Sequence, residues 1–329
     1  IGRATKIQDL LMSEDKEYMG TMTLGKTTSS QDKEGEVLEE RPVGDYDEAQ
    51  IRATFDGLLG DFEQLPPMVS AIKKNGVPLY KLLGKSRDAI PAYASSAVLP
   101  SAAAYAEEAV KFRDAGWAAY KIHPPQRLRD DIAACEAVRN AVGDEFRIML
   151  DSTWGYDFPT ALRVGRAIEE LGFYWYEDPL ADQDVYNYVK LRQTLRIPIM
   201  ATEYPMGGLD GYAVWIMNHA TDYLRGDVAV KGGITTLVKT AHLAEAFRMN
   251  YEIHHGGNSL NNLANLHIAV SIPNTEFFEV LLPDGAQKYG LERDIVVGRD
   301  GMVHVPNEPG LGAAIDFALI ERKKVAVLT

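Results

Sequence analysis

Apolar and polar positions follow a regular alternation from Ala89 onward. Short runs rich in β-branched and aromatic residues alternate with longer segments whose apolar positions recur at helical spacing. The short runs predict eight strands, at Ala89–Ser95, Ala118–His123, Phe146–Asp151, Phe173–Glu177, Pro198–Thr202, Asp227–Val230, Tyr251–His255 and Phe277–Leu282. Helices are expected between them, including Ala102–Ala115, Leu128–Val142, Thr160–Leu171, Val185–Leu195, Thr235–Phe247 and Leu260–Ser271.

This strand repeat predicts an α/β fold with parallel strands joined by helical crossovers. An open doubly wound sheet is the alternative, but it usually binds its ligand through a glycine-rich first turn, and no G-x-G-x-x-G sequence follows any predicted strand. Eight such units close a (β/α) barrel. We therefore expect a barrel catalytic domain over residues 89–288.

The two ends of the chain lack this repeat of strands and helices. Residues 1–88 are charged and broken by Gly and Ser, with helical pieces at Asp47–Leu59 and Asn75–Leu83, which favours a small α+β domain. Gly20–Thr27 matches the phosphate-binding P-loop pattern, but no strand pattern precedes it and no helix pattern follows it, so a polar loop is favoured. In the segment 289–329, Asp294–Val305 predicts a hairpin that turns at Gly298–Gly301 and packs on the N-terminal region.

Composition narrows the class of protein. The 329 residues are 46% hydrophobic and 25% charged, as in ordinary globular proteins. The net charge of −13 argues against nucleic acid as the main partner. Cys135 is the only cysteine, which excludes a disulfide framework and a thiolate metal site. No apolar run is long enough to span a membrane, so a cytoplasmic location without a membrane partner is expected.

Three acidic residues stand at the ends of consecutive predicted strands. Asp151, Glu177 and Glu203 are separated by equal intervals of 26 residues. That interval is about one strand, one helix and two loops, so parallel strands would bring the three carboxylates together at one rim. No cation is expected among them, and such an oxygen-rich group suits a hard divalent metal ion.

Other strand ends also carry ionisable groups. Lys121 and His123 are two residues apart on one strand, so both point to the same face and could exchange protons with a substrate. Glu279 lies in the last predicted strand, Phe277–Leu282. A pair of cations that only balance the acidic cluster is the alternative interpretation of Lys121 and His123.

Parity along the seventh strand distinguishes two histidines. Tyr251 and Ile253 form the apolar, helix-facing set, which leaves His254 pointing inward as the better acid–base candidate. Asp227, one strand earlier, could hold the His254 ring in one tautomer. His255 is either a substrate contact or a packing residue.

At this point the chain resembles the mandelate racemase subgroup of the enolase superfamily, over roughly residues 75–317. The resemblance lies in Gly76–Gly84, Lys121-x-His123, the three spaced carboxylates, Glu177-Asp178-Pro179, Asp227 followed by Gly232-Gly233-Ile234-Thr235, His254, and Pro309–Gly312.

The resemblance implies a (β/α)7β barrel under a capping domain that both chain ends build, and a homo-oligomer. It implies one Mg2+ per subunit on Asp151, Glu177 and Glu203. It further implies a His254–Asp227 dyad, a base at Lys121 or His123, and Glu279 as an electrophilic acid. The subgroup usually carries Lys-x-Lys where this chain has Lys121-x-His123, which leaves open which of the two is the base.

These residues predict removal of a proton α to the carboxylate of a small-molecule substrate. The leading hypothesis is an acid-sugar dehydratase, in which Asn258 and Asn261 could hold the polyol. A racemase or epimerase on the same site is the runner-up. A non-catalytic metal-binding scaffold, or a nucleotide-binding protein through Gly20–Thr27, are the alternatives of another class.

Overall fold

The computed structural model describes residues 23–28, 37–56, 77–204 and 208–324. The chain divides into two units, one of residues 1–75 and 318–329 and the other of residues 76–317. In the first unit, strands β1 (Lys26–Thr28) and β2 (Val37–Glu40) pair antiparallel, and helix α2 (Glu48–Asp56) follows them in sequence. The described chain reaches helix α11 (Phe317–Lys323) at its far end.

The described part of the P-loop-like sequence does not have P-loop structure. Lys26 and Thr27 lie in β1, whereas a P-loop places these two residues at the start of a helix. The Lys26 ammonium pairs with Glu40 at 3.0 Å. Gly20–Met22 lie outside the described residues. The nucleotide-binding alternative therefore loses its structural basis at Lys26 and Thr27.

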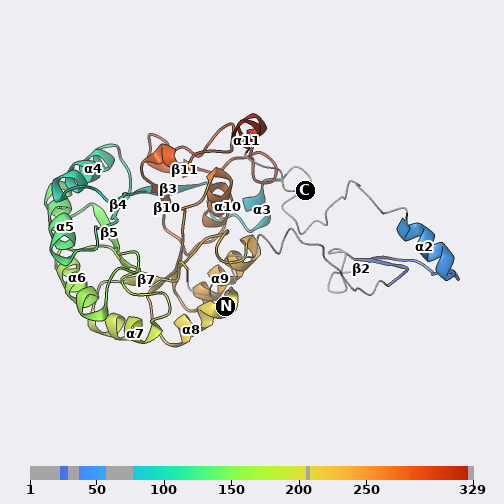
Figure 1. The fold of residues 1–329 in the computed structure, drawn as a ribbon, viewed down its shortest axis with the longest axis horizontal. Helices are drawn as coiled ribbons and strands as arrows, with labels where there is room; N and C mark the ends of the chain where they lie inside the picture. Colours follow the sequence, from blue (N-terminus) through green and yellow to red (C-terminus); the bar gives the residue numbers. More distant parts are fainter. Residues whose placement is uncertain (1–22, 29–36, 57–76, 205–207, 325–329) are drawn as a thin grey trace. The chain divides into compact units, whose positions relative to one another are not determined.

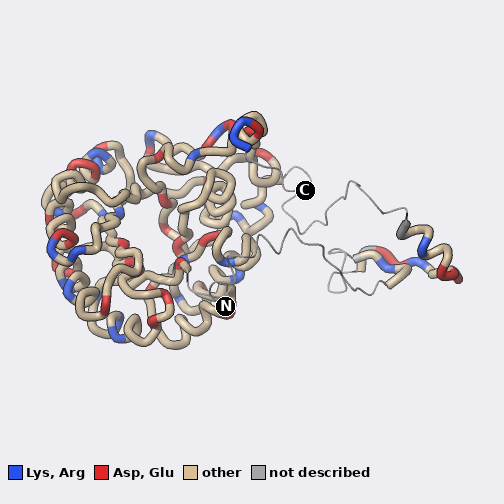
Figure 2. Tube along the Cα trace, viewed as in Figure 1, with Lys and Arg blue, Asp and Glu red and all other residues tan. Residues whose placement is uncertain are grey.

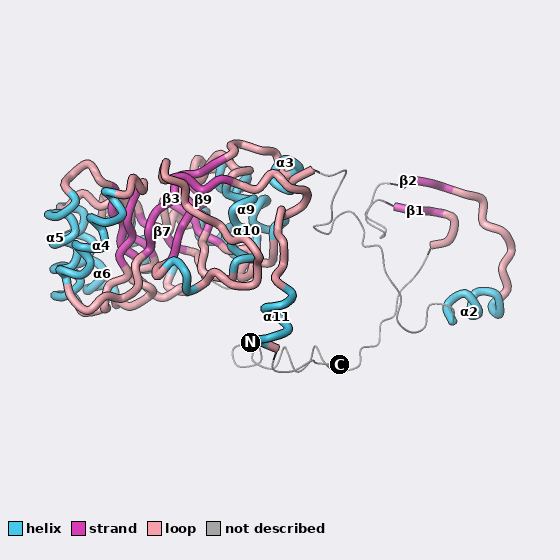
Figure 3. Tube along the Cα trace, turned by 90° about the horizontal axis from the view of Figure 1, so that it is seen from above, coloured by secondary structure: helices cyan, strands magenta, loops and turns pink. Residues whose placement is uncertain are grey.

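The larger unit is a nearly closed barrel of parallel strands with helices around it (Figures 1 and 3). Its strands pair in the order β10-β3-β4-β5-β6-β7-β8-β9. They are β3 (Ala89–Ser95), β4 (Ala119–Ile122), β5 (Arg147–Asp151), β6 (Tyr176–Glu177), β7 (Ile199–Ala201), β8 (Tyr223–Gly226), β9 (Asn250–Ile253) and β10 (Phe278–Leu281). The helices are α3 (Leu79–Leu82), α4 (Ala102–Asp114), α5 (Leu128–Val142), α6 (Phe158–Glu170), α7 (Val185–Thr194), α8 (Leu209–Met217), α9 (Ile234–Ala246) and α10 (Ser259–Ala269), with a 3-10 turn at Asp284–Ala286.

The predicted α/β barrel is therefore confirmed, but the sixth strand was misplaced. The strand is Tyr223–Gly226, and the predicted segment Asp227–Val230 is a turn that follows it. The apolar residues Val228–Val230 resemble a strand, but the Asp227 carboxylate accepts the N–H of Ala229 at 2.7 Å and bends the backbone. The strand Tyr223–Gly226 was not predicted because it contains a charged residue, Arg225.

A carboxylate bridges the strand pair at which the barrel is least complete. Both oxygens of Glu252 on β9 accept the N–H of Glu276, at 3.1 and 3.2 Å, and the Thr275 hydroxyl donates to one of them at 3.1 Å. These bonds join β9 to the segment that leads into β10. Burial raises the pKa of Glu252 to about 7, against the hydrogen bonds that favour its ionised form.

The predicted hairpin in the tail is present. The N–H of Gly298 donates to the carbonyl of Met302 at 2.8 Å, which closes the turn. Strand β11 (Met302–His304) then pairs antiparallel with β3. This part of the tail therefore pairs with a strand of the barrel. The wider assignment of 1–88 and 289–329 to one capping domain stays a prediction.

The barrel interior is layered by the two-residue period of its strands. An apolar layer contains Tyr93, Ala119, Met149, Trp175, Met200 and Phe277. Four site residues follow members of this layer by two positions: Lys121, Asp151, Glu177 and Glu279. Because residues two apart share a face, the charged layer lies one pleat above an apolar floor. Figure 2 shows acidic positions on these inner strands as well as on the outer helices.

No helix in the described residues is both long enough and apolar enough to cross a membrane.

Candidate active site at the strand ends

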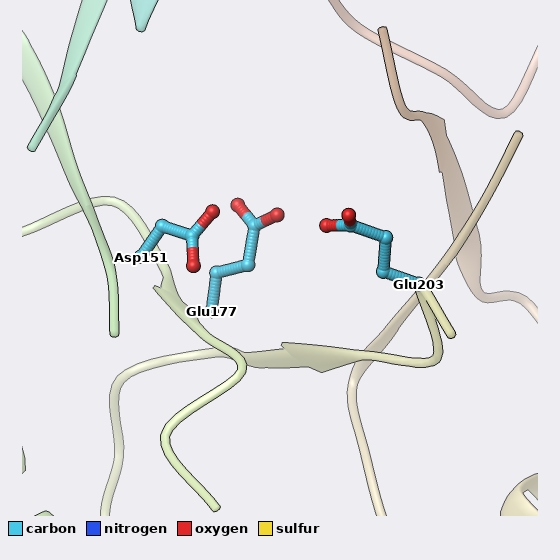
Figure 4. A group of neighbouring side chains, drawn as sticks. All are labelled: Asp151, Glu177 and Glu203. Atoms are coloured by element: carbon cyan, nitrogen blue, oxygen red, sulfur yellow. The ribbon is translucent and has the colours of Figure 1, made fainter. Parts of the chain in front are cut away.

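The three spaced carboxylates converge as predicted. Asp151 ends β5, Glu177 ends β6, and Glu203 follows β7. Asp151 and Glu177 are direct partners in the strand register. One oxygen atom from each of the three residues lies within 4.8 Å of the others (Figure 4). All three side chains are buried, so the group can hold a metal ion in a water-poor setting.

Two buried cations lie against this triad, contrary to the expectation that none would. The Lys121 ammonium is 3.0 Å from Asp151, 2.9 Å from Glu177 and 2.8 Å from Glu279. Arg225 from β8 lies 2.6 Å from Glu177 through Nε and also pairs with Glu279. The expectation failed because a charge-balancing role for Lys121 was only the alternative interpretation, and Arg225 lay outside the predicted strand Asp227–Val230.

The network nevertheless keeps an excess of negative charge. Five buried carboxylates face two buried cations, and they are Asp151, Glu177, Glu203, Asp227 and Glu279. Counted with every carboxyl group ionised and both flanking imidazoles neutral, the two cations compensate two of the five charges and leave three. Oε1 of Glu177 is paired with Arg225 Nε at 2.6 Å, so this oxygen does not lack a partner. A buried group with more carboxylates than cations fits a divalent cation.

The pKa values of Glu177 and Glu279 shift in opposite directions, although both residues contact Lys121 and Arg225. Burial and the Asp151 charge raise the pKa of Glu177 to about 7, although Arg225 and Lys121 oppose the rise. Burial acts the same way on Glu279, but Arg225 and Lys121 outweigh it and hold its pKa well below its usual range. Glu279 is therefore an ionised acceptor in this arrangement, not yet the electrophilic acid that the resemblance implies.

Lys121 is held as an ammonium by its neighbours. Burial and Arg225 lower its pKa, but Glu177 and Glu279 outweigh them and raise it well above its ordinary value. A further cation among these carboxylates would act in the opposite direction.

His123 contacts the triad from the β4 side. Its Nε2 lies 3.0 Å from Asp151, and its Nδ1 lies 2.7 Å from the carbonyl oxygen of Ser96. Burial lowers the pKa of His123, but the Asp151 charge and hydrogen bond raise it overall. Lys121 and His123 thus share a face, as predicted, and both contact Asp151.

His254 contacts the triad from the β9 side. Its Nε2 lies 3.1 Å from Glu203, and its Nδ1 lies 3.0 Å from Asp227. Burial lowers the pKa of His254, but Glu203 and Asp227 raise it overall. The predicted dyad is therefore present in the geometry, with His254 inward and Asp227 behind it.

His255 takes the packing alternative. Its ring lies against Phe278 at 3.8 Å between centroids, and it is 1% exposed. Burial lowers its pKa to about 3, so the ring is neutral. Asn258 and Asn261 are also engaged within the protein: Asn258 caps α10 and Asn261 donates to Asp227. These contacts do not support the expectation that they hold a polyol.

Sequence reasoning missed two groups at the site. Arg225 stands two residues before Asp227, so a correct placement of β8 would have put both on the inner face. The Trp175 indole donates to Glu177 at 3.1 Å, and its signal was the same two-residue spacing.

Fold and site together define a parallel α/β barrel with acid–base groups on both sides of a carboxylate triad that can hold a metal ion. Residues 104–319 match the family described as Enolase C-terminal domain-like, and the chain therefore belongs to the enolase superfamily.

Several relatives are acid-sugar dehydratases. The arabinonate dehydratase of Saccharolobus solfataricus is 27% identical over 262 residues, which cover 77% of this chain and 68% of that protein. The L-talarate/galactarate dehydratase of Salmonella typhimurium is 30% identical over 261 residues, which cover 77% and 61%. A crystal structure of D-glucarate dehydratase from Agrobacterium tumefaciens complexed with magnesium has a TM-score of 0.70 at 37% identity, and the match covers 76% of this chain and 69% of that one.

Residues 1–93 match a different family, the N-terminal domain of TruB pseudouridylate synthases. The tRNA pseudouridine synthase B of Opitutus terrae is 58% identical over 85 residues, which cover 26% of this chain and 35% of that protein. The chain thus spans about a third of that relative and roughly two thirds of the dehydratases. This match offers a second interpretation of residues 1–88 beside the capping domain.

Proposed function

We propose that the protein uses Mg2+ to abstract the proton α to a substrate carboxylate and dehydrates an acid sugar, an aldonate or aldarate, to a 2-keto-3-deoxy acid. The observation that carries this proposal is the placement of basic groups on both sides of the triad. His123 contacts Asp151 on one side, and His254 contacts Glu203 on the other, at 3.0 and 3.1 Å.

The carboxylate triad supplies the metal site in this proposal. Asp151, Glu177 and Glu203 would hold one Mg2+, which lowers the energy of the charge that develops on the substrate carboxylate when the α-proton leaves. The excess of carboxylates over cations in the buried network supports this assignment. The rest of the chemistry belongs to side chains.

Two sets of side chains move the protons. Lys121 or His123 takes the α-proton, and the electron pair of the broken C–H bond moves into the carboxylate. His254 as imidazolium then gives a proton to the β-hydroxyl, the C–O bond breaks, and water leaves. The resulting enol takes up a proton at C3 and releases the proton of its C2 hydroxyl, which gives the 2-keto acid. Asp227 orients the His254 ring, and Glu279, once protonated, is the electrophilic acid of this proposal.

The relatives support the dehydration more than the alternative racemisation. Three of them bear the names arabinonate, L-talarate/galactarate and D-gluconate dehydratase, at 26 to 30% identity. These identities do not select a substrate. We also predict that the protein binds a small-molecule carboxylate, forms a homo-oligomer and is cytoplasmic.

The test is incubation of the full chain and Mg2+ with a panel of mono- and diacid sugars, scored for 2-keto acid. We expect product from at least one member, and loss of product with Lys121→Met or His254→Gln. Inversion at the α-carbon without 2-keto acid would establish the racemase instead. No product and no α-hydrogen exchange with any member, while Mg2+ binding is intact, would refute the enzymatic proposal.

A further inference from the structure

Two asparagines of α10 donate hydrogen bonds to the carboxylate of Asp227, which lies behind the His254 ring. Asn261 and Asn265 stand four residues apart, so they share one face of the helix. The Asn261 amide donates to both oxygens of Asp227, at 3.1 and 3.2 Å. The Asn265 amide donates to Asp227 at 3.2 Å. Helix α10 therefore faces the dyad with two amide donors.

Asn265 also holds the backbone on both sides of the dyad. Its amide nitrogen donates to the carbonyl of His254 at 2.9 Å, and its amide oxygen accepts the N–H of Val228 at 3.0 Å. The side chain is fully buried. One residue therefore ties the turn after β8 to the end of β9, which are the two segments that carry Asp227 and His254.

These contacts dictate the proton position on the His254 ring. The Asp227 oxygens accept from both asparagines and from the N–H of Ala229, so the group acts as an acceptor-only carboxylate. The 3.0 Å contact with His254 Nδ1 then requires a proton on Nδ1. Nε2 is left to face Glu203 and the cavity.

We propose that Asn261 and Asn265 are positioning residues for the reaction, because they fix Asp227 and thereby the tautomer and orientation of His254. This inference rests on the proposed function for its kinetic consequence, but the tautomer itself can be measured without substrate. Neither asparagine is assigned a contact with substrate. Their effect reaches the reaction through His254, in the way that outer-shell hydrogen bonds orient the groups they support.

The experiment compares Asn261→Leu and Asn265→Leu with Asn262→Leu on the full chain. Asn262 is a matched control, because it lies on the same helix but donates to the carbonyl of Gly257 at 3.3 Å and does not touch the dyad. Asn261 is only half-buried, so its variant keeps the test informative if Asn265→Leu fails to fold. Two quantities are measured: formation of the 2-keto acid, and exchange of the substrate α-hydrogen in deuterated water.

We expect kcat for dehydration to fall about 10- to 100-fold in the two dyad variants, with KM changed less than about threefold. Exchange at the α-carbon uses Lys121 or His123, so it should persist, and the ratio of exchange to elimination should rise. Asn262→Leu should change neither. Equal loss of exchange and elimination, or no loss in Asn261→Leu, would overturn the proposal.

Nitrogen-15 NMR of the imidazoles separates this inference from the proposed function. In the unmodified protein, at a pH at which the ring is neutral, His254 should carry its proton on Nδ1, and Asn261→Leu should shift the population between the two ring nitrogens. If no acid sugar reacts but this shift occurs, the proposed function fails and the positioning role stands. An unchanged tautomer in Asn261→Leu would refute the positioning role whatever the activity.

Discussion

Replacement of Arg225 by Met tests whether the buried network is a charge-balanced unit. Arg225 lies 2.6 Å from Glu177 and also pairs with Glu279, and these three side chains are at most 2% exposed. Loss of one partner from a buried ion pair costs about 3–5 kcal/mol, because the other charge stays buried. Lys121 remains beside both glutamates, so we expect a loss near 3 kcal/mol at neutral pH.

The assay is urea unfolding followed by tryptophan fluorescence, with and without Mg2+. The control is Arg127→Met, which removes an exposed ion pair of 2.7 Å to Asp130 and should cost about 0–1 kcal/mol. Mg2+ at a hundred times its dissociation constant stabilises a folded state by about 2.7 kcal/mol. With less positive charge beside the triad, Arg225→Met should bind Mg2+ more tightly and gain more stability from it than the unmodified chain. A loss no larger than that of Arg127→Met, or no greater response to Mg2+, would refute this reasoning.

Three further predictions concern the site and its support. A Cβ at Gly256 would lie 2.5 Å from the His254 ring, so Gly256→Ala should reduce the rate of dehydration at least about tenfold. Its thermal unfolding temperature should stay nearly unchanged, because Gly256 is exposed. Full activity would show that the ring is not constrained there. His267 accepts the N–H of Tyr80 and contacts the carbonyl of Leu311, and burial lowers its pKa. The contribution of the neutral His267 ring to stability should therefore be complete above about pH 6.5, which is the pKa of histidine in the unfolded chain. Below that pH the free energy of unfolding should fall, by up to about 1.4 kcal/mol per pH unit. His267→Gln should reduce this dependence of the free energy of unfolding on pH between about pH 7 and 5, and an unchanged dependence would contradict the prediction. Glu203→Gln should weaken Mg2+ binding in calorimetry and abolish dehydration, and retention of both would show that the metal site is misplaced.

The barrel was predictable because its signals are periodic and local. The strands Ala89–Ser95 and Phe146–Asp151 were located to within one residue at either end, since β-rich runs bounded by helical segments leave little choice. The triad followed from the same periodicity, because parallel strands bring equally spaced residues to one rim.

The failures came from residues whose partners are distant in sequence. Arg225 is an improbable strand residue until Glu177 and Glu279 surround it, and neither neighbour is visible in a local window. The contacts of Asn265 likewise arise only when helix α10 packs against the ends of two strands. An asparagine is common in loops, so the sequence alone did not indicate these contacts.

The N-terminal region shows a different limit. Its short, charged pieces gave no long periodic run. The P-loop-like sequence was disfavoured because no strand pattern precedes it and no helix pattern follows it, and Lys26 and Thr27 do lie in a strand. The family match of residues 1–93 could not be inferred from pattern alone. The pairing of β11 with β3 was missed because a hairpin signal specifies its turn but not the surface on which it packs.

The central claim is that the strand ends form one metal-dependent site for removal of an α-proton. The most direct measurement is the exchange of substrate α-hydrogen with deuterated water, followed by NMR over the acid-sugar panel, with Mg2+ and with excess chelator. We expect exchange with at least one acid sugar, and this exchange should require Mg2+ and be lost in Glu203→Gln. Exchange that persists in chelator and in Glu203→Gln would contradict the central claim.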